Sequence, residues 1–324
     1  MRPAPAAGPA LPARLAPPAY PGDFPDPFIL PAGGGYFAYA TNANDAHVQM
    51  LPLSAGLQAL GPPVEALPRL PGWAAPQPGL TWAPAVLPRP GGWVLYYTTR
   101  HRCTGLQAIS LAVSAAPGGP FVDCSSAPLL LQPGLGGAID PSPFVAPDGA
   151  AYLLWKNDGN SCGQASRLWI QPLARDGRSL TGAPVELLRT ACPWEGPLIE
   201  APAMLHHRGC FYLFYSANAW SGPAYAIGLA AGPTPLGPFT RTQPGPWLSS
   251  GGGLLGPGGA EVFSGPDGRP WLAFHAWTAP HTGYPAGRRA LRLAPLAFRG
   301  GLPALDAAGE PPEACTELPI GVTM

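Results

Sequence analysis

The apolar and polar positions of this chain follow one pattern that recurs five times. Each copy has an apolar run, a glycine-containing turn and then an aromatic-rich run. The copies read DPFILPAGGGYFAYATN from Asp26, APAVLPRPGGWVLYYTTR from Ala83, DPSPFVAPDGAAYLLWKND from Asp140, EAPAMLHHRGCFYLFYSAN from Glu200 and AEVFSGPDGRPWLAFHAW from Ala260. Aromatic and β-branched runs bounded by Gly, Pro and Asp turns are typical of strands. Each copy therefore predicts a β-hairpin.

The spacing of the copies predicts the fold. Their aligned prolines, Pro27, Pro84, Pro143 and Pro202, are 57, 59 and 59 residues apart, and a further step of 59 reaches Glu261. A second apolar pair about a turn follows each hairpin, so each unit holds about four antiparallel strands. Five such units predict an all-β, five-bladed β-propeller of four-stranded antiparallel blades. A chain of separate β-sandwich domains is the alternative, but it would not preserve so even a spacing.

The front of each unit is where function is expected. The first strand of each propeller blade lines the central channel, so residues some 60 positions apart converge at one mouth. Units one, three and four carry Asp26, Asp140 and Glu200 there, and unit two carries Trp82 at the equivalent place. Paired carboxylates can protonate a leaving oxygen and activate water, as glycoside hydrolysis requires. The alternative is that these acids only cap turns before proline.

The ordered motifs FPDPF, TWAP, IDPSPF, IEAPAM and LAFHAW resemble those of glycoside hydrolase family 43. The resemblance covers nearly the whole chain, from about Tyr20 to Pro319. It implies a five-bladed propeller that hydrolyses arabinosides and xylosides with inversion of configuration.

Matched motif by motif, the resemblance also implies roles for particular residues. Asp26 would be the general base and Glu200 the general acid, while Asp140 would orient Glu200 and favour its protonated form. Arg289, in the segment Gly287-Arg288-Arg289, resembles the channel arginine of the family and would hold a carboxylate.

The segments WKNDGN at 155–160 and AIDPSPF at 138–144 most resemble those of one branch of the family. This branch releases terminal α-L-arabinofuranosyl groups by exo cleavage of 1,5-linked chains. A β-xylosidase or an endo-arabinanase is the alternative within the family. A propeller that binds carbohydrate or protein without catalysis is the alternative outside it. The expected partner is an arabinose- or xylose-containing oligosaccharide or polysaccharide.

Aromatic and polar residues near the predicted strand ends are candidates for substrate contact. They are Trp82, Trp155, Asn157, Trp220, His275 and Arg289. Tryptophans of propellers also wedge between blades, so each has a structural alternative, and Trp82 is favoured because it shares the register of the carboxylates.

The last unit departs from the family pattern. Members often carry a Gly-His-Asn motif there, with a histidine near a central metal, whereas this chain has Gly258-Gly259-Ala260-Glu261. We therefore predict no required cofactor and no metal ligand set. Should calcium bind, His275 is the candidate ligand, although a hydrogen-bonded core histidine is the commoner case.

Composition excludes several other classes. The 324 residues include 48 prolines and 43 glycines, which rules out long helices, yet 46% hydrophobic and 10% aromatic residues argue against disorder. The net charge is zero and lysine occurs once, at Lys156, so we expect no nucleic-acid partner. No apolar run is long enough for a membrane span. We expect a monomer, with a flexible Pro/Ala-rich segment over 1–18 and one catalytic propeller over 19–324.

Six cysteines suggest an oxidising compartment, and hence secretion, although no signal peptide is visible. The expected pairs are Cys103–Cys124 and Cys162–Cys192, each flanking one hairpin region, with Cys210–Cys315 left by elimination. Six buried free thiols are the alternative. None of the cysteines is spaced as Cys-x-x-Cys, which argues against structural zinc.

Two short motifs match enzyme signatures by chance. Gly159–Gly163 fits the G-x-S-x-G nucleophile elbow, but a strand rather than a helix is predicted after it. Gly251–Gly256 fits G-x-G-x-x-G without the helix that a dinucleotide site needs.

Overall fold

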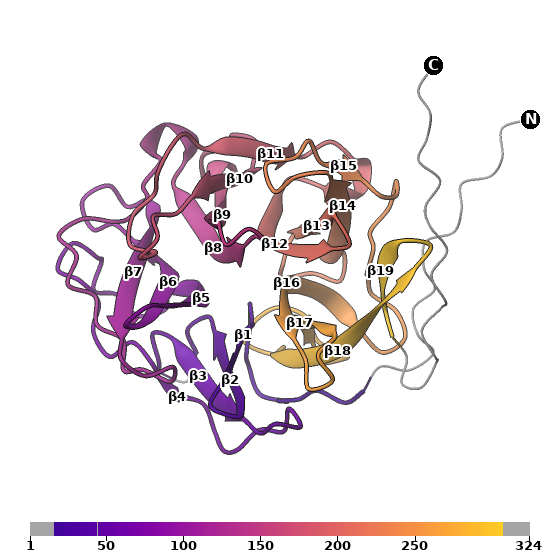
Figure 1. The fold of residues 1–324 in the computed structure, drawn as a ribbon, viewed down its shortest axis with the longest axis horizontal. Coiled ribbons are helices and arrows are strands. Elements are labelled where there is room, and N and C mark those ends of the chain that lie inside the picture. The colour runs from indigo at the N-terminus through magenta and orange to yellow at the C-terminus, as the bar shows by residue number, and fades with distance from the viewer. Residues whose placement is uncertain (1–15, 44, 307–324) are drawn as a thin grey trace, which may run out of the picture.

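The computed structural model describes residues 16–43 and 45–306. These residues form five antiparallel sheets arranged around a central axis (Figure 1). The first sheet contains β1 (Phe28–Ala32), β2 (Gly35–Ala40), β3 (Gln49–Leu53) and β4 (Val64–Glu65). The second contains β5 (Trp82–Arg89), β6 (Gly92–Arg100) and β7 (Gln107–Ser114). The third contains β8 (Ala138–Val145), β9 (Ala151–Asn157), β10 (Arg167–Pro172) and β11 (Val185–Arg189).

The fourth sheet contains β12 (Ile199–His207), β13 (Cys210–Ala217), β14 (Ala226–Gly232) and β15 (Thr240–Arg241). The fifth contains β16 (Leu255–Ser264), β17 (Pro270–Trp277), β18 (Arg289–Arg299) and β19 (Leu302–Leu305). Four sheets thus have the predicted four strands, while the second has three, and its last strand continues only in isolated bridges such as the one between Val113 and Val122. The five-bladed β-propeller is confirmed.

The first strand of every blade lies at the centre. β1, β5, β8, β12 and β16 each contact the next in a closed ring (Figure 1). The ring closes where β1 meets β16, and the segment before β1 ties the first blade to the fifth through a bridge from Tyr20 to Leu291 of β18. The ring explains why residues at the starts of these strands meet.

Apolar packing joins each blade to its neighbour. Five clusters of buried side chains each combine residues of two adjacent sheets. In one of them, Ile29 and Leu51 of the first blade pack with Phe263 and Leu291 of the fifth. Burial of these faces supplies the main stabilisation of a propeller, because each sheet is apolar on both sides.

Within residues 16–43 and 45–306, the helices are three short 3-10 turns, η1 (Pro133–Leu135), η2 (Gly159–Cys162) and η3 (Pro193–Glu195). No helix in the described ranges is long and apolar enough to cross a membrane. The strand β10 follows η2, which confirms that a strand and not a helix comes after the G-x-S-x-G match.

The expected disulfides are not formed. Cys103, Cys124, Cys162, Cys192 and Cys210 are free thiols, and the first three are exposed. The pairs Cys103–Cys124 and Cys162–Cys192 were therefore wrong, because a shared hairpin region in the sequence does not bring two Cβ atoms within bonding distance. Cys315, together with residues 1–15, lies outside the described residues.

Candidate active site

One backbone feature recurs at the start of every first strand. Five residues there have a positive φ: Asp26 (51°), Ala83 (43°), Asp140 (57°), Ala201 (49°) and Gly259 (59°). In β5, β8, β12 and β16 the pairing register also shifts at this point. Such bulges redirect side chains and are common beside active sites.

The bulges revise the alignment of the units. Asp26 and Asp140 share their position with Ala83, Ala201 and Gly259, so Pro141 rather than Pro143 follows the third bulge. Glu200 lies one residue earlier, in the register of Trp82. The prediction that Trp82 is equivalent to all three carboxylates was therefore wrong for Asp26 and Asp140. A one-residue bulge is invisible to an alignment made on proline spacing.

Glycine is required at the fifth bulge. A Cβ on Gly259 would lie 2.7 Å from Nδ1 of His275 and 2.9 Å from Oδ1 of Asp26. Because Gly259 has no side chain, Asp26 of the first blade can lie against His275 of the fifth blade.

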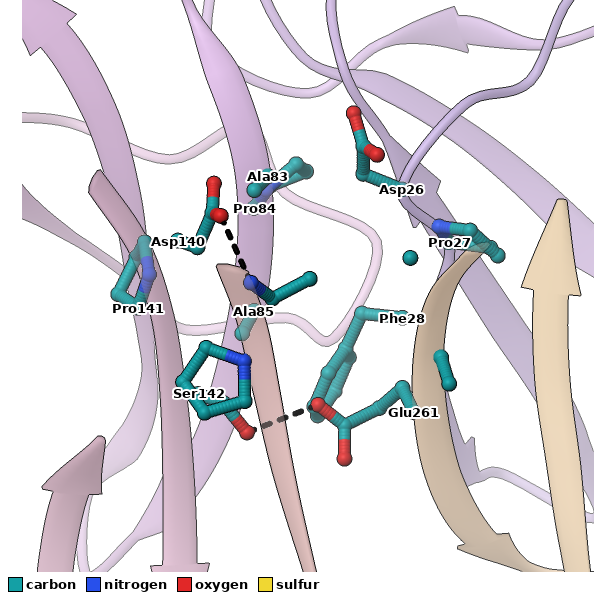
Figure 2. A pocket seen from close by; sticks show the side chains of 14 residues that line it. Asp26, Pro27, Phe28, Ala83, Pro84, Ala85, Asp140, Pro141, Ser142 and Glu261 are labelled. Carbon is teal, nitrogen blue, oxygen red and sulfur yellow. Dashed lines mark hydrogen bonds between the residues drawn. The ribbon is translucent and has the colours of Figure 1, made fainter. Parts of the chain in front are cut away.

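A pocket of about 870 Å³ opens above this ring, and all five blades contribute to its lining. Asp26, Asp140 and Glu200 line it together, as predicted. Trp82, Trp220 and Arg289 line it as well. Below the mouth the channel narrows, and Figure 2 shows Asp26 and Asp140 at one end of this narrow part, with Ser142 and Glu261 farther along.

Asp26 is fixed by two hydrogen bonds and by the charge of Arg289. Its backbone N–H donates to Nδ1 of His275 (3.0 Å), and its Oδ2 accepts a hydrogen bond from the Thr41 hydroxyl (2.6 Å). Nη1 of Arg289 lies 3.6 Å from Oδ1, and Nδ1 of His275 lies 3.4 Å from the same oxygen. Burial, followed by the charge of Arg289, lowers the pKa of His275 well below its usual value. The ring is therefore neutral, and Nδ1 acts as the acceptor.

Glu200 has a different set of partners. Its Oε2 accepts a hydrogen bond from Nζ of Lys156 (3.0 Å), and its Oε1 accepts one from the Tyr225 hydroxyl (2.8 Å). Burial and the neighbouring Glu200 carboxylate raise the pKa of Tyr225 well above its usual value. The phenol therefore keeps its proton and remains a donor.

Asp140 connects the third blade to the fourth. Its Oδ2 accepts a hydrogen bond from the backbone N–H of Ala201 (2.9 Å), the residue directly after Glu200. Burial, and then the negative charge of Glu200, raise the pKa of Asp140 to about 8, while Lys156 opposes the shift. Near neutral pH this side of the pocket therefore retains a proton that an isolated aspartate would have lost.

Aromatic side chains form part of the wall around Arg289. The guanidinium lies 4.8 Å from the ring centroid of Trp220 and 5.6 Å from that of Tyr284. Its Nε donates to the Tyr284 hydroxyl (3.2 Å), which in turn donates to Asp23 (2.7 Å). Trp220 is 40% exposed and lines the pocket.

Three expected substrate contacts are corrected by the structure. Trp155, Asn157 and His275 are each fully buried. The Trp155 indole stacks on Trp169, and the Asn157 amide donates to the carbonyl oxygens of Leu135 and Ala165. Successive side chains of a strand point to opposite faces. On β9 it is Lys156, between them, that faces the pocket.

His275 is likewise a core residue, stacked on Tyr225 with ring centroids 5.9 Å apart. Within the described ranges, no group of three or more His, Cys, Asp and Glu side chains is arranged to hold a metal ion.

Several residues of the site were not predicted. The sequence marks Lys156 only as the single lysine, and it predicts no role for Tyr225, Thr41, Asp23 or Tyr284. Lys156 had one available signal, since a lone charged residue inside the apolar run LLWKN is unusual. The others lie in loops or at strand ends without a repeated pattern.

A propeller with three carboxylates at one mouth and aromatic rings beside them is the arrangement of a glycoside hydrolase. A sequence profile described as "Glycosyl hydrolases family 43" matches residues 16–303. The chain belongs to this family and is a glycoside hydrolase. The family acts on arabinans and xylans.

Particular relatives agree with this assignment. The chain is 25% identical over 289 residues to a probable arabinan endo-1,5-α-L-arabinosidase B of Aspergillus fumigatus, and the match covers 74% of each chain. A thermostable family-43 glycoside hydrolase of known structure is 28% identical, with a TM-score of 0.78 over 93% of this chain and 98% of that one. An endo-1,4-β-xylanase from Bacteroides thetaiotaomicron shares the fold, with 24% identity and a TM-score of 0.73 over 90% and 96% of the two chains.

Proposed function

We propose that this enzyme is an inverting exo-α-L-arabinofuranosidase that removes terminal arabinofuranosyl groups from 1,5-linked arabinan. The observation that carries the proposal is the convergence of Asp26, Asp140 and Glu200 on one pocket. Residues from all five blades line this pocket. The choice of exo cleavage is supported by the similarity of WKNDGN at 155–160 and AIDPSPF at 138–144 to the exo-acting branch of the family.

The environments of the carboxylates support distinct roles. Asp26, paired with Arg289 and Thr41, acts as the base that takes a proton from water. Glu200 gives its proton to the departing sugar oxygen while the bond from that oxygen to the anomeric carbon breaks. Asp140 holds the backbone directly after Glu200, and these two neighbouring acids retain one proton between them because a second negative charge in the buried site is costly. Trp220 offers an aromatic face to the sugar.

An endo-arabinanase is the second candidate. It is favoured by the Aspergillus relative, whose name specifies endo cleavage of 1,5-linked arabinan. The two candidates share the chemistry and differ only in where on the polymer the cut falls.

A product assay distinguishes these functions. On debranched 1,5-arabinan the exo enzyme should release arabinose alone from the first minutes, whereas an endo enzyme should first produce oligosaccharides. The rate on 4-nitrophenyl α-L-arabinofuranoside should exceed that on 4-nitrophenyl β-D-xyloside, and proton NMR should show the inverted anomer first. Early oligosaccharides, a preference for the xyloside or a retained anomer would each overturn the corresponding part of the proposal.

A further inference from the structure

Lys156 is the only lysine of the chain, and it is buried in the wall of the pocket. Its exposed fraction is 1%, which is rare for a lysine. It occupies β9, with the buried Trp155 and Asn157 on either side. All other basic side chains counted in the net charge are arginines, so the one side-chain ammonium of the chain lies beside the proposed acid.

The ammonium is surrounded by carboxylates from three directions. It lies 3.0 Å from Oε2 of Glu200 and 3.7 Å from Oδ1 of Asp158, and it interacts with the charge of Asp140. Burial opposes the charged form of Lys156, but the attraction of these carboxylates outweighs it and raises the pKa of the lysine. The cation therefore persists at working pH. Tyr225 and the more distant Asp26 complete the titratable groups that face this cluster.

We propose that Lys156 is a positioning residue for proton transfer, which together with Tyr225 fixes both oxygens of Glu200 and stabilises the carboxylate left after Glu200 has donated its proton. The inference rests on the proposed role of Glu200 as the acid. It adds an opposing pair, because Asp140 and Glu200 disfavour two negative charges side by side while the charge of Lys156 favours the anionic form of Glu200.

The step balances as follows. The Glu200 proton moves to the glycosidic oxygen, which keeps the electron pair of the breaking bond to the anomeric carbon. Water forms the new bond to that carbon and gives its proton to Asp26. Glu200 is then an anion at 3.0 Å from the ammonium, in a site where a charge-assisted hydrogen bond is stronger than in water. A later proton from solvent restores Glu200, and Asp26 releases its own.

Lysine suits this position better than arginine. The ammonium is a compact point charge that can serve Glu200 and Asp158 together, whereas a guanidinium is planar and favours one carboxylate through two parallel bonds. The chain uses arginine at every other basic position, including Arg289 next to Asp26.

The first test needs no substrate. Glutamate is labelled with ¹³C at Cδ, and the Glu200 signal is assigned by its absence in Glu200→Gln. In Lys156→Met the titration midpoint of that signal should move to higher pH by about one unit or more, because an opposite charge within hydrogen-bonding distance has been removed. Arg178→Met, which removes an exposed charge of the same blade, is the matched control and should leave the midpoint in place. An unmoved midpoint in Lys156→Met would overturn the proposal even if the enzyme proved to cleave another glycoside.

The second test measures kcat and KM on arabino-oligosaccharides and on a nitrophenyl arabinofuranoside. Lys156→Met should lower kcat about tenfold on the oligosaccharide and less than about twofold on the activated substrate, because a weaker acid matters only for a poor leaving group. The alkaline limb of kcat/KM should move to higher pH. Equal losses on both substrates with an unmoved limb would show a merely structural role.

Two further variants guard against misfolding. Lys156→Gln replaces the ammonium with a neutral hydrogen-bond donor and should show the same shifts if Lys156→Met does not fold. Tyr225→Phe removes the other hydrogen bond without a change of cationic charge, so its midpoint should move much less. A shift in Tyr225→Phe as large as in Lys156→Met would argue that hydrogen bonding, and not the ammonium charge, sets the state of Glu200.

Discussion

Asp26 and Glu200 enter the same pocket from the first and the fourth blade, and each is paired with one cation and one hydroxyl group. Asp26 has Arg289 at 3.6 Å and Thr41 at 2.6 Å, whereas Glu200 has Lys156 at 3.0 Å and Tyr225 at 2.8 Å. Arg289 is held by its own bond to Tyr284 and by the Trp220 ring, so it supplies charge without a direct hydrogen bond to Asp26.

The difference between the two sides teaches how similar partner sets can serve opposite proton roles. A guanidinium does not lose its proton in a protein, which suits a base that must stay a carboxylate. On the Glu200 side, the pKa of Asp140 is raised to about 8, so Asp140 and Glu200 together hold a proton near neutral pH. Lys156, 3.0 Å from Glu200, favours the carboxylate that remains when the proton leaves. The bulges on either side of Asp26, at Ala83 and Gly259, carry no acidic side chain, whereas Asp140 occupies the bulge next to the blade of Glu200. This neighbouring acid makes the two sides of the pocket differ.

The largest expected effect comes from the Asp26 side. Asp26→Asn removes the group that activates water, which every substrate needs. We expect kcat/KM to fall about 10⁴-fold on both arabino-oligosaccharides and a nitrophenyl arabinofuranoside. Asp148→Asn, at an exposed turn of the third blade, is the matched control and should be fully active. If Asp26→Asn kept its activity on the nitrophenyl substrate, Asp26 would not be the base.

The Glu200 side should depend on the leaving group. Glu200→Gln removes the proton donor, so kcat/KM on oligosaccharides should fall about 10²–10⁴-fold. A nitrophenolate leaves without protonation, and the loss there should be much smaller. Glu186→Gln, a change at a partly exposed ion pair with Arg189, serves as the control. Equal losses on both substrates would reverse the assignment of acid and base.

The repeat made the fold and much of the site predictable. A recurring hairpin at nearly constant spacing has few solutions other than a propeller, and acids at the fronts of units must then converge. The repeat predicts for this reason that Asp26, Asp140 and Glu200 meet, and the family resemblance adds Arg289; all four line the pocket.

The remaining features depend on information that the repeat does not carry. The bulge and the pairing of β8 decide which face of β9 lines the pocket. The sequence pattern therefore favours Trp155 and Asn157 as substrate contacts, whereas the side chain of β9 that faces the pocket is Lys156. Tyr225 reaches Glu200 from a loop 25 residues further along the chain, and no spacing rule connects them.

Asp140 gives an intermediate effect, visible in the pH profile. The coupled pair of Asp140 and Glu200 holds a proton at neutral pH because two like charges are costly in a buried site. Asp140→Asn removes the charge that favours this proton, while Lys156 remains. The alkaline limb of kcat/KM, measured from pH 5 to 9, should therefore move to lower pH, with about a tenfold loss at pH 7. The limb should move in the opposite direction from that of Lys156→Met, and an unchanged limb would contradict the role of Asp140.

The smallest effect concerns Glu261, a channel carboxylate with a hydroxyl partner but, among the described residues, no ion-pair partner. Its Oε2 accepts a hydrogen bond from Ser142 (2.9 Å), and burial raises its pKa to about 7 (Figure 2). The folded protein therefore retains a proton that the unfolded chain releases near pH 4.5, so stability from this group falls as pH rises from about 4.5 to 7. Glu261→Gln cannot ionise and should escape this loss, which would be about 1–3 kcal/mol in the free energy of unfolding at pH 8.

Ser142→Ala removes the donor that favours the Glu261 anion and should make the decline in stability larger. Chemical unfolding at pH 5 and pH 8 measures both effects. If the free energy of unfolding of the wild type falls no more over this range than that of Glu261→Gln, the lack of a cation partner does not distinguish Glu261 from Asp26 and Glu200.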